Sequence, residues 1–169
     1  NGSVNTGFLQ GEYGNQFIGF NLNNNNDKLS SYINGQYNNG NDYTITNTDR
    51  ILSVDSILRQ ESKTIRPNHS VNMGYGFGKT IKEKWELNYD GRMSQNKFDN
   101  TTHSASYLRL IALDQNFGNL ASDINNKGVN NFINQSFRVK LKLDTVGGEW
   151  VNDVNFNFSN SSTDQNYSN

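Results

Sequence analysis

The chain has 169 residues, of which 33% are hydrophobic, 12% aromatic and 18% charged, and its mean hydropathy is -0.82. This is little apolar material for a soluble core of that length, but more aromatic material than disordered chains carry. The net charge of -1 provides no nucleic-acid signature, and the absence of cysteine excludes a disulfide scaffold and a cysteine-ligated zinc site.

The first part of the chain predicts three strands, because apolar residues recur at every second position. These strands cover residues 3–10, 17–23 and 29–37. On the first two, the residues that share a face are Val4, Thr6, Phe8, Ile18, Phe20 and Leu22. An Asn-rich turn precedes the third strand, since Asn and Asp tolerate the left-handed backbone.

Two long segments, residues 38–68 and 94–130, interrupt the remaining strand pattern. The strands predicted around them cover residues 69–78, 85–93, 132–143 and 150–158. Both segments are longer than connections in compact domains, and we expect them to be loops. Residues 107–113 are apolar; their spacing also fits a short helix, and we favour a small hairpin.

The clearest pattern lies between Phe132 and Phe158. Its first limb alternates apolar residues with Arg138, Lys140 and Lys142, and its second alternates apolar residues with Asn and Asp. Each limb therefore has one apolar and one polar face. Long antiparallel strands of this kind are typical of a transmembrane β-barrel wall, so we predict an all-β, antiparallel barrel-wall segment of about seven strands.

The connections support this interpretation, because short turns are predicted at one end of the sheet and long loops at the other. Trp85 and Trp150 each begin a strand just after a short turn, which would place both at the same membrane interface. The alternative is that they are core residues of a soluble β-domain.

Two sets of residues follow from the alternation. We expect one continuous apolar face to contain Ile18, Phe20, Leu22, Val71, Met73, Leu87, Tyr89, Val139, Leu141, Val154 and Phe156. We expect the barrel interior to contain the charged residues Glu86, Asp90, Arg92, Arg138, Lys140 and Lys142. Opposite charges on neighbouring strands would pair and rigidify the wall, or alternatively line a substrate path.

No motif predicts reaction chemistry, so we expect no enzyme, catalytic residue, cofactor or metal. Residues 74–80 superficially resemble a phosphate-binding loop, but Met73 stands where the first glycine is needed. The glycines there fit a strand that turns them toward the barrel interior. His69 and His103 lie in different long segments, without carboxylates at metal-ligand spacing.

Several segments resemble the outer-membrane β-barrel domain of TonB-dependent receptors of Bacteroidetes type. They are residues 2–8, 20–23, 28–37 and 143–147. The resemblance covers nearly the whole chain and concerns the residue pattern and the order of the segments, without an invariant signature. It implies that residues 2–8 are the first barrel strand after a plug domain, in a barrel of roughly 22 strands. It also implies that the segments 38–68 and 94–130 are extracellular.

The resemblance further implies a transporter that imports a large nutrient, such as an iron chelate, cobalamin, a glycan or a peptide. Its partners would be outer-membrane lipid, the plug and remaining strands of the same protein, TonB through an N-terminal part outside this chain, and a surface lipoprotein, but no nucleic acid. The chain starts at Asn1 without an export signal, so we expect it to be part of a longer protein. Two alternatives stay open: a non-transport outer-membrane barrel that serves as an adhesin or surface-complex subunit, and a soluble, secreted, glycan-binding β-domain.

Overall fold

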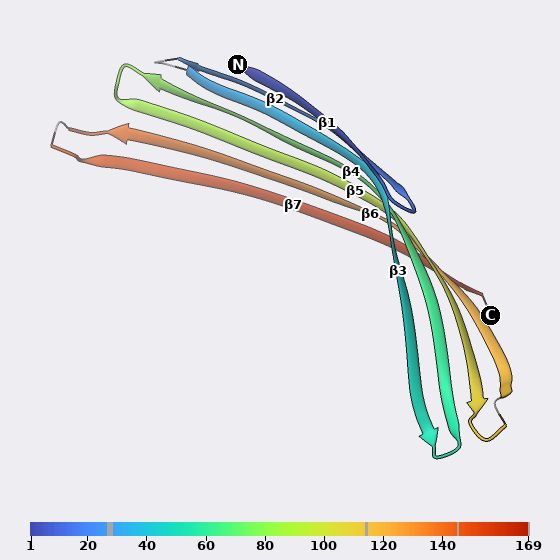
Figure 1. Cartoon of the computed structure of the whole chain (residues 1–169). Coiled ribbons are helices and arrows are strands. Elements are labelled where there is room, and N and C mark those ends of the chain that lie inside the picture. Colours follow the sequence, from blue (N-terminus) through green and yellow to red (C-terminus); the bar gives the residue numbers. More distant parts are fainter. Residues whose placement is uncertain (27–28, 114, 145, 169) are drawn as a thin grey trace.

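The protein is one antiparallel sheet of seven strands that pair in chain order (Figure 1). The structure, a computed structural model, describes residues 1–26, 29–113, 115–144 and 146–168. The strands are β1 (Gly2–Gln10), β2 (Gly14–Asn26), β3 (Leu29–Ser53), β4 (Ser56–Ile81), β5 (Trp85–Leu110), β6 (Gln115–Lys142) and β7 (Glu149–Ser168). In this part of the chain no helix is long and apolar enough to cross a membrane. The all-β, antiparallel prediction is confirmed, and each predicted strand falls in a different observed strand.

The sheet is open, and it bends along the strand direction (Figure 1). β1 and β7 each pair on one side only, so both edges of the described sheet present unpaired backbone groups. The hairpins β3–β4 and β5–β6 project well past the β1–β2 hairpin (Figure 1). The two ends of the sheet therefore differ in strand length, while every described connection is short.

The prediction of long loops at residues 38–68 and 94–130 is wrong. β3 continues to Ser53 and β4 starts at Ser56, while β5 continues to Leu110 and β6 starts at Gln115. The segments are extended hairpin arms, paired almost residue by residue. Their periodicity escapes notice because Asn, Ser, Thr and charged residues occupy both faces, and backbone pairing needs no apolar side. The hairpin favoured at residues 107–113 corresponds to the end of β5 and its turn.

The sheet is a single layer without a hydrophobic core. No large side chain is buried among the described residues, and many apolar ones are strongly exposed, with Val4 at 74% and Phe156 at 56%. The buried residues of the described chain are all glycines: Gly19, Gly35, Gly74, Gly76 and Gly91. Packing within this layer therefore occurs above glycines.

Aromatic rings cover several of these glycines from the directly opposite position on the next strand. Tyr75 faces Gly91, and its ring would lie 2.5 Å from a Cβ placed on that glycine. Its hydroxyl reaches Gln135, one strand further, whose Nε2 donates to it at 3.0 Å. Tyr32 crosses Gly76 in the same way to donate a hydrogen bond to Asp90, at 2.8 Å. Such pairs shield glycine backbone and link three strands through one side chain.

Candidate functional site

The first functional feature is a continuous band of apolar side chains on one face, which we call the apolar band. Residues opposite each other on antiparallel strands share a face, so the register assigns the faces directly. The eleven residues predicted to lie together all fall on this face. Met93, Ile133 and Phe158 join them in one row. The prediction of one continuous apolar face is confirmed.

Both tryptophans mark one margin of the apolar band. Trp85 pairs with Leu141, and Leu141 pairs with Trp150, so the two indoles stand in one row across three strands. From this row the band extends along β5 to Met93, which is nine residues. Nine residues of a strand that is tilted by roughly 45° to the normal of a bilayer would cover about 20 Å along that normal.

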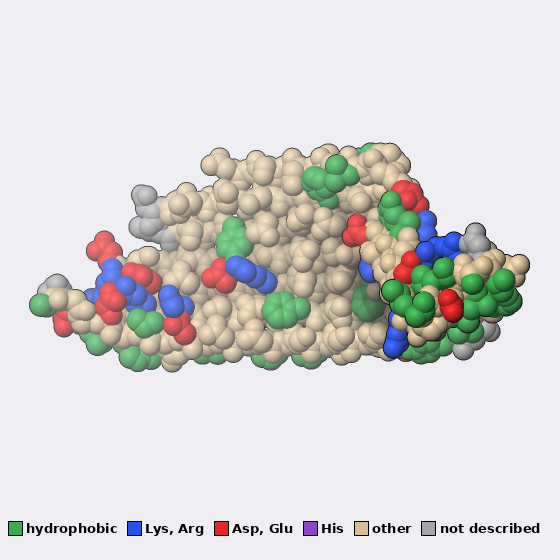
Figure 2. All heavy atoms as spheres, turned by 60° about the horizontal axis from the view of Figure 1, so that its bottom comes forward, with side chains coloured by type: hydrophobic (Ala, Val, Ile, Leu, Met, Phe, Trp, Pro, Cys, Tyr) green, Lys and Arg blue, Asp and Glu red, His purple; other side chains and the backbone are tan. Residues whose placement is uncertain are grey.

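The opposite face is polar, and we call it the polar face. Figure 2 shows a broad area on which polar side chains and backbone prevail, hydrophobic side chains are isolated, and charged ones gather toward both ends. One row across the sheet illustrates its composition: Ser3, Asn21, Asn34, Gly74, Arg92, Asn134 and Asn157. A whole sheet face of amide and hydroxyl side chains is typical of the surfaces that line water-filled passages.

All six charged residues assigned to the barrel interior lie on the polar face, and most of them pair. Lys140 Nζ lies 2.7 Å from a Glu149 carboxylate oxygen and 3.9 Å from Glu86. Lys142 Nζ lies 3.3 Å from Glu86. Lys140 thus connects three strands, β5, β6 and β7, near their turns. These contacts fit the structural interpretation of the charge ladder.

Arg138 makes the best-formed ion pair of this group. Its Nε and Nη2 donate to the two carboxylate oxygens of Asp153 on β7 at 2.6 and 3.1 Å, in the bidentate geometry that suits guanidinium. Asp153 and Glu149 come from β7 and were not among the predicted charged residues. Their alternation with Trp150 and Val154 in the sequence was the signal that could have identified them.

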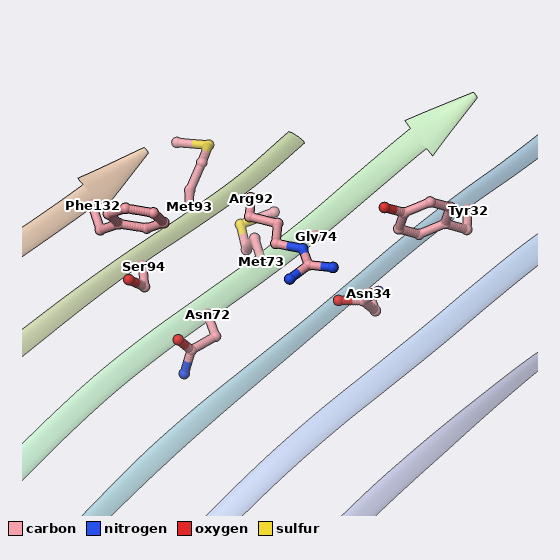
Figure 3. A pocket seen from close by; sticks show the side chains of 9 residues that line it. All are labelled: Tyr32, Asn34, Asn72, Met73, Gly74, Arg92, Met93, Ser94 and Phe132. Carbon is pink, nitrogen blue, oxygen red and sulfur yellow. The ribbon is translucent and has the colours of Figure 1, made fainter. Parts of the chain in front are cut away.

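A hollow of ≈ 510 Å³ lies around Gly74, with side chains on several strands at its rim (Figure 3). Gly74, Gly76 and Gly78 occupy successive positions of β4 on the polar face. Asn34 and Tyr32 stand on β3, and Arg92 stands on β5. The glycine-rich segment 74–80 is therefore strand, and side chains from β3 and β5 lie over its alternate glycines, as Asn34 does over Gly74 with Oδ1 2.8 Å from a Cβ placed there.

The hairpin arms beyond the apolar band carry ion pairs on the same face as the band. Arg59 donates to both carboxylate oxygens of Asp49 at 2.7 Å each, and this holds the pKa of Asp49 below its usual range. His103 Nδ1 lies 2.7 Å from Asp123 Oδ1. The arms are thus stabilised by cross-strand charge where the apolar band ends.

One cluster ties the β1–β2 turn to these arms. Lys63 Nζ lies 2.9 Å from Glu12 Oε1, and 5.8 and 5.5 Å from the ring centroids of Tyr13 and Tyr43. The hydrogen bond with Glu12 raises the pKa of Lys63, and it lowers that of Glu12. The cation therefore stays charged above two aromatic rings at the level where the band gives way to polar residues.

The tips of the two long hairpins form an apolar patch. Ile51 is 75% exposed, Val54 90% and Leu113 61%. The tips lie side by side, since the N–H of Ile111 donates to the carbonyl of Asp55 at 2.9 Å. Figure 2 shows the corresponding gathering of hydrophobic side chains at its right-hand end. The sequence analysis identified the apolar stretch at residues 107–113 but not its position beside the tip of the β3–β4 hairpin.

The described residues contain no group of three or more His, Cys, Asp or Glu side chains arranged to hold a metal ion. His69 pairs across the sheet with Lys97, and His103 with Asp123. No protein-family profile matches the chain, and no related sequence was found among curated proteins.

Proposed function

We propose that this chain is part of the wall of a bacterial outer-membrane β-barrel, in a TonB-dependent transporter that imports a large nutrient. The observation that carries the membrane assignment is the apolar band, nine residues tall on β5, bounded by Trp85 and Trp150 and backed by the polar face. The transporter class rests on the resemblance of residues 2–8, 20–23, 28–37 and 143–147 to such receptors.

The energetics favour a cover of hydrocarbon over the apolar band. A single layer without a core leaves its apolar side chains exposed, and in water each such face costs free energy in proportion to its area. A strand crosses a bilayer in about 9–11 residues, which matches the height of the band. A second protein layer could also cover it, but it would not require tryptophans in a single row at one margin.

The edges and the polar face fit a closed barrel as well. Open sheet edges are not tolerated in hydrocarbon, so further strands must pair with β1 and β7. In a closed wall the polar face would surround water. The long hairpins, whose two faces are largely polar apart from their apolar tips, would then extend into solvent on the outer side.

The test uses the full-length protein inserted in vesicles of brominated lipids. The quenching that is lost in Trp85→Phe, and that lost in Trp150→Phe, relative to the wild type reports on each of these two indoles in turn. We expect shallow bromine positions to quench both indoles more strongly than deep ones, and to the same extent. Absence of quenching would refute the membrane assignment in favour of a soluble β-domain.

The apolar hairpin tips favour a second candidate, a surface-complex subunit. Exposed patches of large apolar residues commonly mark protein contacts. The double variant Val54→Ser and Leu113→Ser should abolish assembly of a surface complex. Nutrient uptake by cells separates the two functions, because a protein that serves only as a complex subunit would support no uptake as wild type or as the double variant.

A further inference from the structure

The hollow around Gly74 gathers polar side chains that make no hydrogen bond or ion pair with the residues that the structure describes. Among the described residues, four of its side chains make no hydrogen bond or ion pair; they are Asn34, Asn72, Arg92 and Ser94. Elsewhere on the polar face such groups pair with each other, as Asn38 does with Ser70 at 3.2 Å. Convergent polar groups in a hollow of ≈ 510 Å³ are the features of a small-molecule site.

Arg92 differs from the other predicted interior cations because no described carboxylate forms an ion pair with it. Arg138, Lys140 and Lys142 each have a carboxylate within 4 Å. The acid nearest to Arg92 along its strand, Asp90, instead accepts the hydroxyl hydrogen of Tyr32. The Arg92 side chain reaches over β4 on the side of Asn34 (Figure 3). Gly74 has no side chain to block this path, and the Asn34 amide lies beside it, with Oδ1 2.8 Å from a Cβ placed on Gly74.

The charge of the hollow selects a monoanion. Backbone N–H groups of central strands are consumed by the sheet, so a phosphate would find one guanidinium and no free main-chain donors. The carboxylate of Asp90, two residues from Arg92, adds repulsion toward a dianion. A single planar carboxylate matches both the charge and the fork of one arginine.

The neutral groups select the remainder of the ligand. Asn34, Asn72 and Ser94 donate and accept hydrogen bonds, as sugar hydroxyls require. The rings of Tyr32 and Phe132 stand at opposite sides of the hollow (Figure 3), three strands and four register positions apart, so a single sugar can pack its apolar C–H edge against only one of them.

We propose that this hollow binds an acidic sugar, with its carboxylate on Arg92 and its hydroxyls on the three neutral polar side chains. This inference rests on the proposed function, because only in a barrel wall does the polar face line a passage. It narrows the nutrient to a glycan that contains uronic acid.

The experiment measures calorimetric binding of galacturonate and of galactose to the full-length protein in lipid nanodiscs. The pair differs in the carboxylate alone. Arg92→Gln removes the charge, and Arg50→Gln removes the same charge from the same face at the tip of β3. We expect galacturonate to bind about tenfold more weakly to Arg92→Gln, as loss of one charge-assisted hydrogen bond predicts, and normally to Arg50→Gln.

Equal binding of the two sugars by the wild type, or unchanged galacturonate binding by Arg92→Gln, would overturn the proposal. So would failure of both sugars to bind. If that failure came with a lower melting temperature of Arg92→Gln, a carboxylate of the protein itself would be the partner of Arg92. Lipid quenching of the tryptophans in the same preparation separates the two inferences: a protein that is quenched but does not bind loses only the site.

Discussion

The sharpest test of the wall assignment is the depth dependence of an introduced charge along one strand. Phe137 lies on the apolar face four residues from Leu141, whose row contains both tryptophans. Four residues span about 13 Å along a strand and roughly 9 Å along the normal at a tilt near 45°. In the proposed wall, Phe137 is therefore near the middle of the hydrocarbon, and Leu141 is at its margin.

This difference in depth sets the expected magnitudes. Arginine facing lipid costs about 2–4 kcal/mol near the midplane and about 0–1 kcal/mol near an interface. We expect Phe137→Arg to lower the free energy of unfolding by the larger amount and Leu141→Arg by the smaller. Ser136→Arg serves as the matched control, because Ser136 precedes Phe137 on the chain and lies on the polar face opposite Asp90. Its cost should stay within about 0.5 kcal/mol.

The assay is reversible urea unfolding of the full-length protein in vesicles, monitored by tryptophan fluorescence. Variants are compared with the same slope of the unfolding free energy against urea concentration. Equal losses for Phe137→Arg and Ser136→Arg would show that both faces meet the same medium. A larger loss of unfolding free energy for Leu141→Arg than for Phe137→Arg would show that the row of the tryptophans does not lie at the margin of the membrane. Either result refutes the proposed placement of the wall.

Three further changes test local structure. Gly91→Val should destabilise by about 1–3 kcal/mol in the same urea assay, because a Cβ there would lie 2.5 Å from the tyrosine ring that crosses it. Replacing Lys82 by Asn and Glu83 by Gly should stabilise by about 1 kcal/mol, since both have positive φ, 49° and 56°, and a lower urea midpoint would contradict this. The N–H of Gly148 lowers the pKa of Asp144, so this carboxylate's contribution to stability is full above its ordinary pKa of 3.8 and is lost as the pH falls through the lowered value. Asp144→Asn should therefore flatten the pH dependence of the urea midpoint between pH 3.8 and the lowered pKa.

Sequence reasoning recovers the fold wherever one face is apolar. The pattern between Phe132 and Phe158 predicts β6 and β7 because apolar and polar residues alternate without interruption. It fails in the hairpin arms, where residues such as Thr46 and Ser62 face each other and both faces are polar. A sheet stabilised there by backbone pairing has no period-2 signal in hydropathy.

The candidate site shows the same division. Alternation is enough to assign the six charged residues predicted for the interior to the polar face, because this requires only knowing which alternate positions of each strand share a face. Pairing requires the register, which depends on turn geometry and on where each strand begins. For this reason the hydrogen bond between Tyr32 and Asp90, beside an Arg92 that forms no ion pair with the described part of the chain, is visible only in the structure.

The single layer also explains how a chain with 33% hydrophobic residues can specify one arrangement. A layered soluble domain needs apolar faces that meet, whereas a barrel wall needs one apolar face over the height of the bilayer. The register must then be determined within the layer. Aromatic residues opposite glycines provide this: Tyr75 over Gly91, Phe20 over Gly35 and Phe98 over Gly128 fit only when the two residues are directly opposed. A slip of one residue would turn each ring to the other face, away from its glycine, and would place polar side chains in the apolar band. Ring–glycine pairs and the apolar band therefore select the same register, and a sequence poor in apolar residues still encodes one sheet.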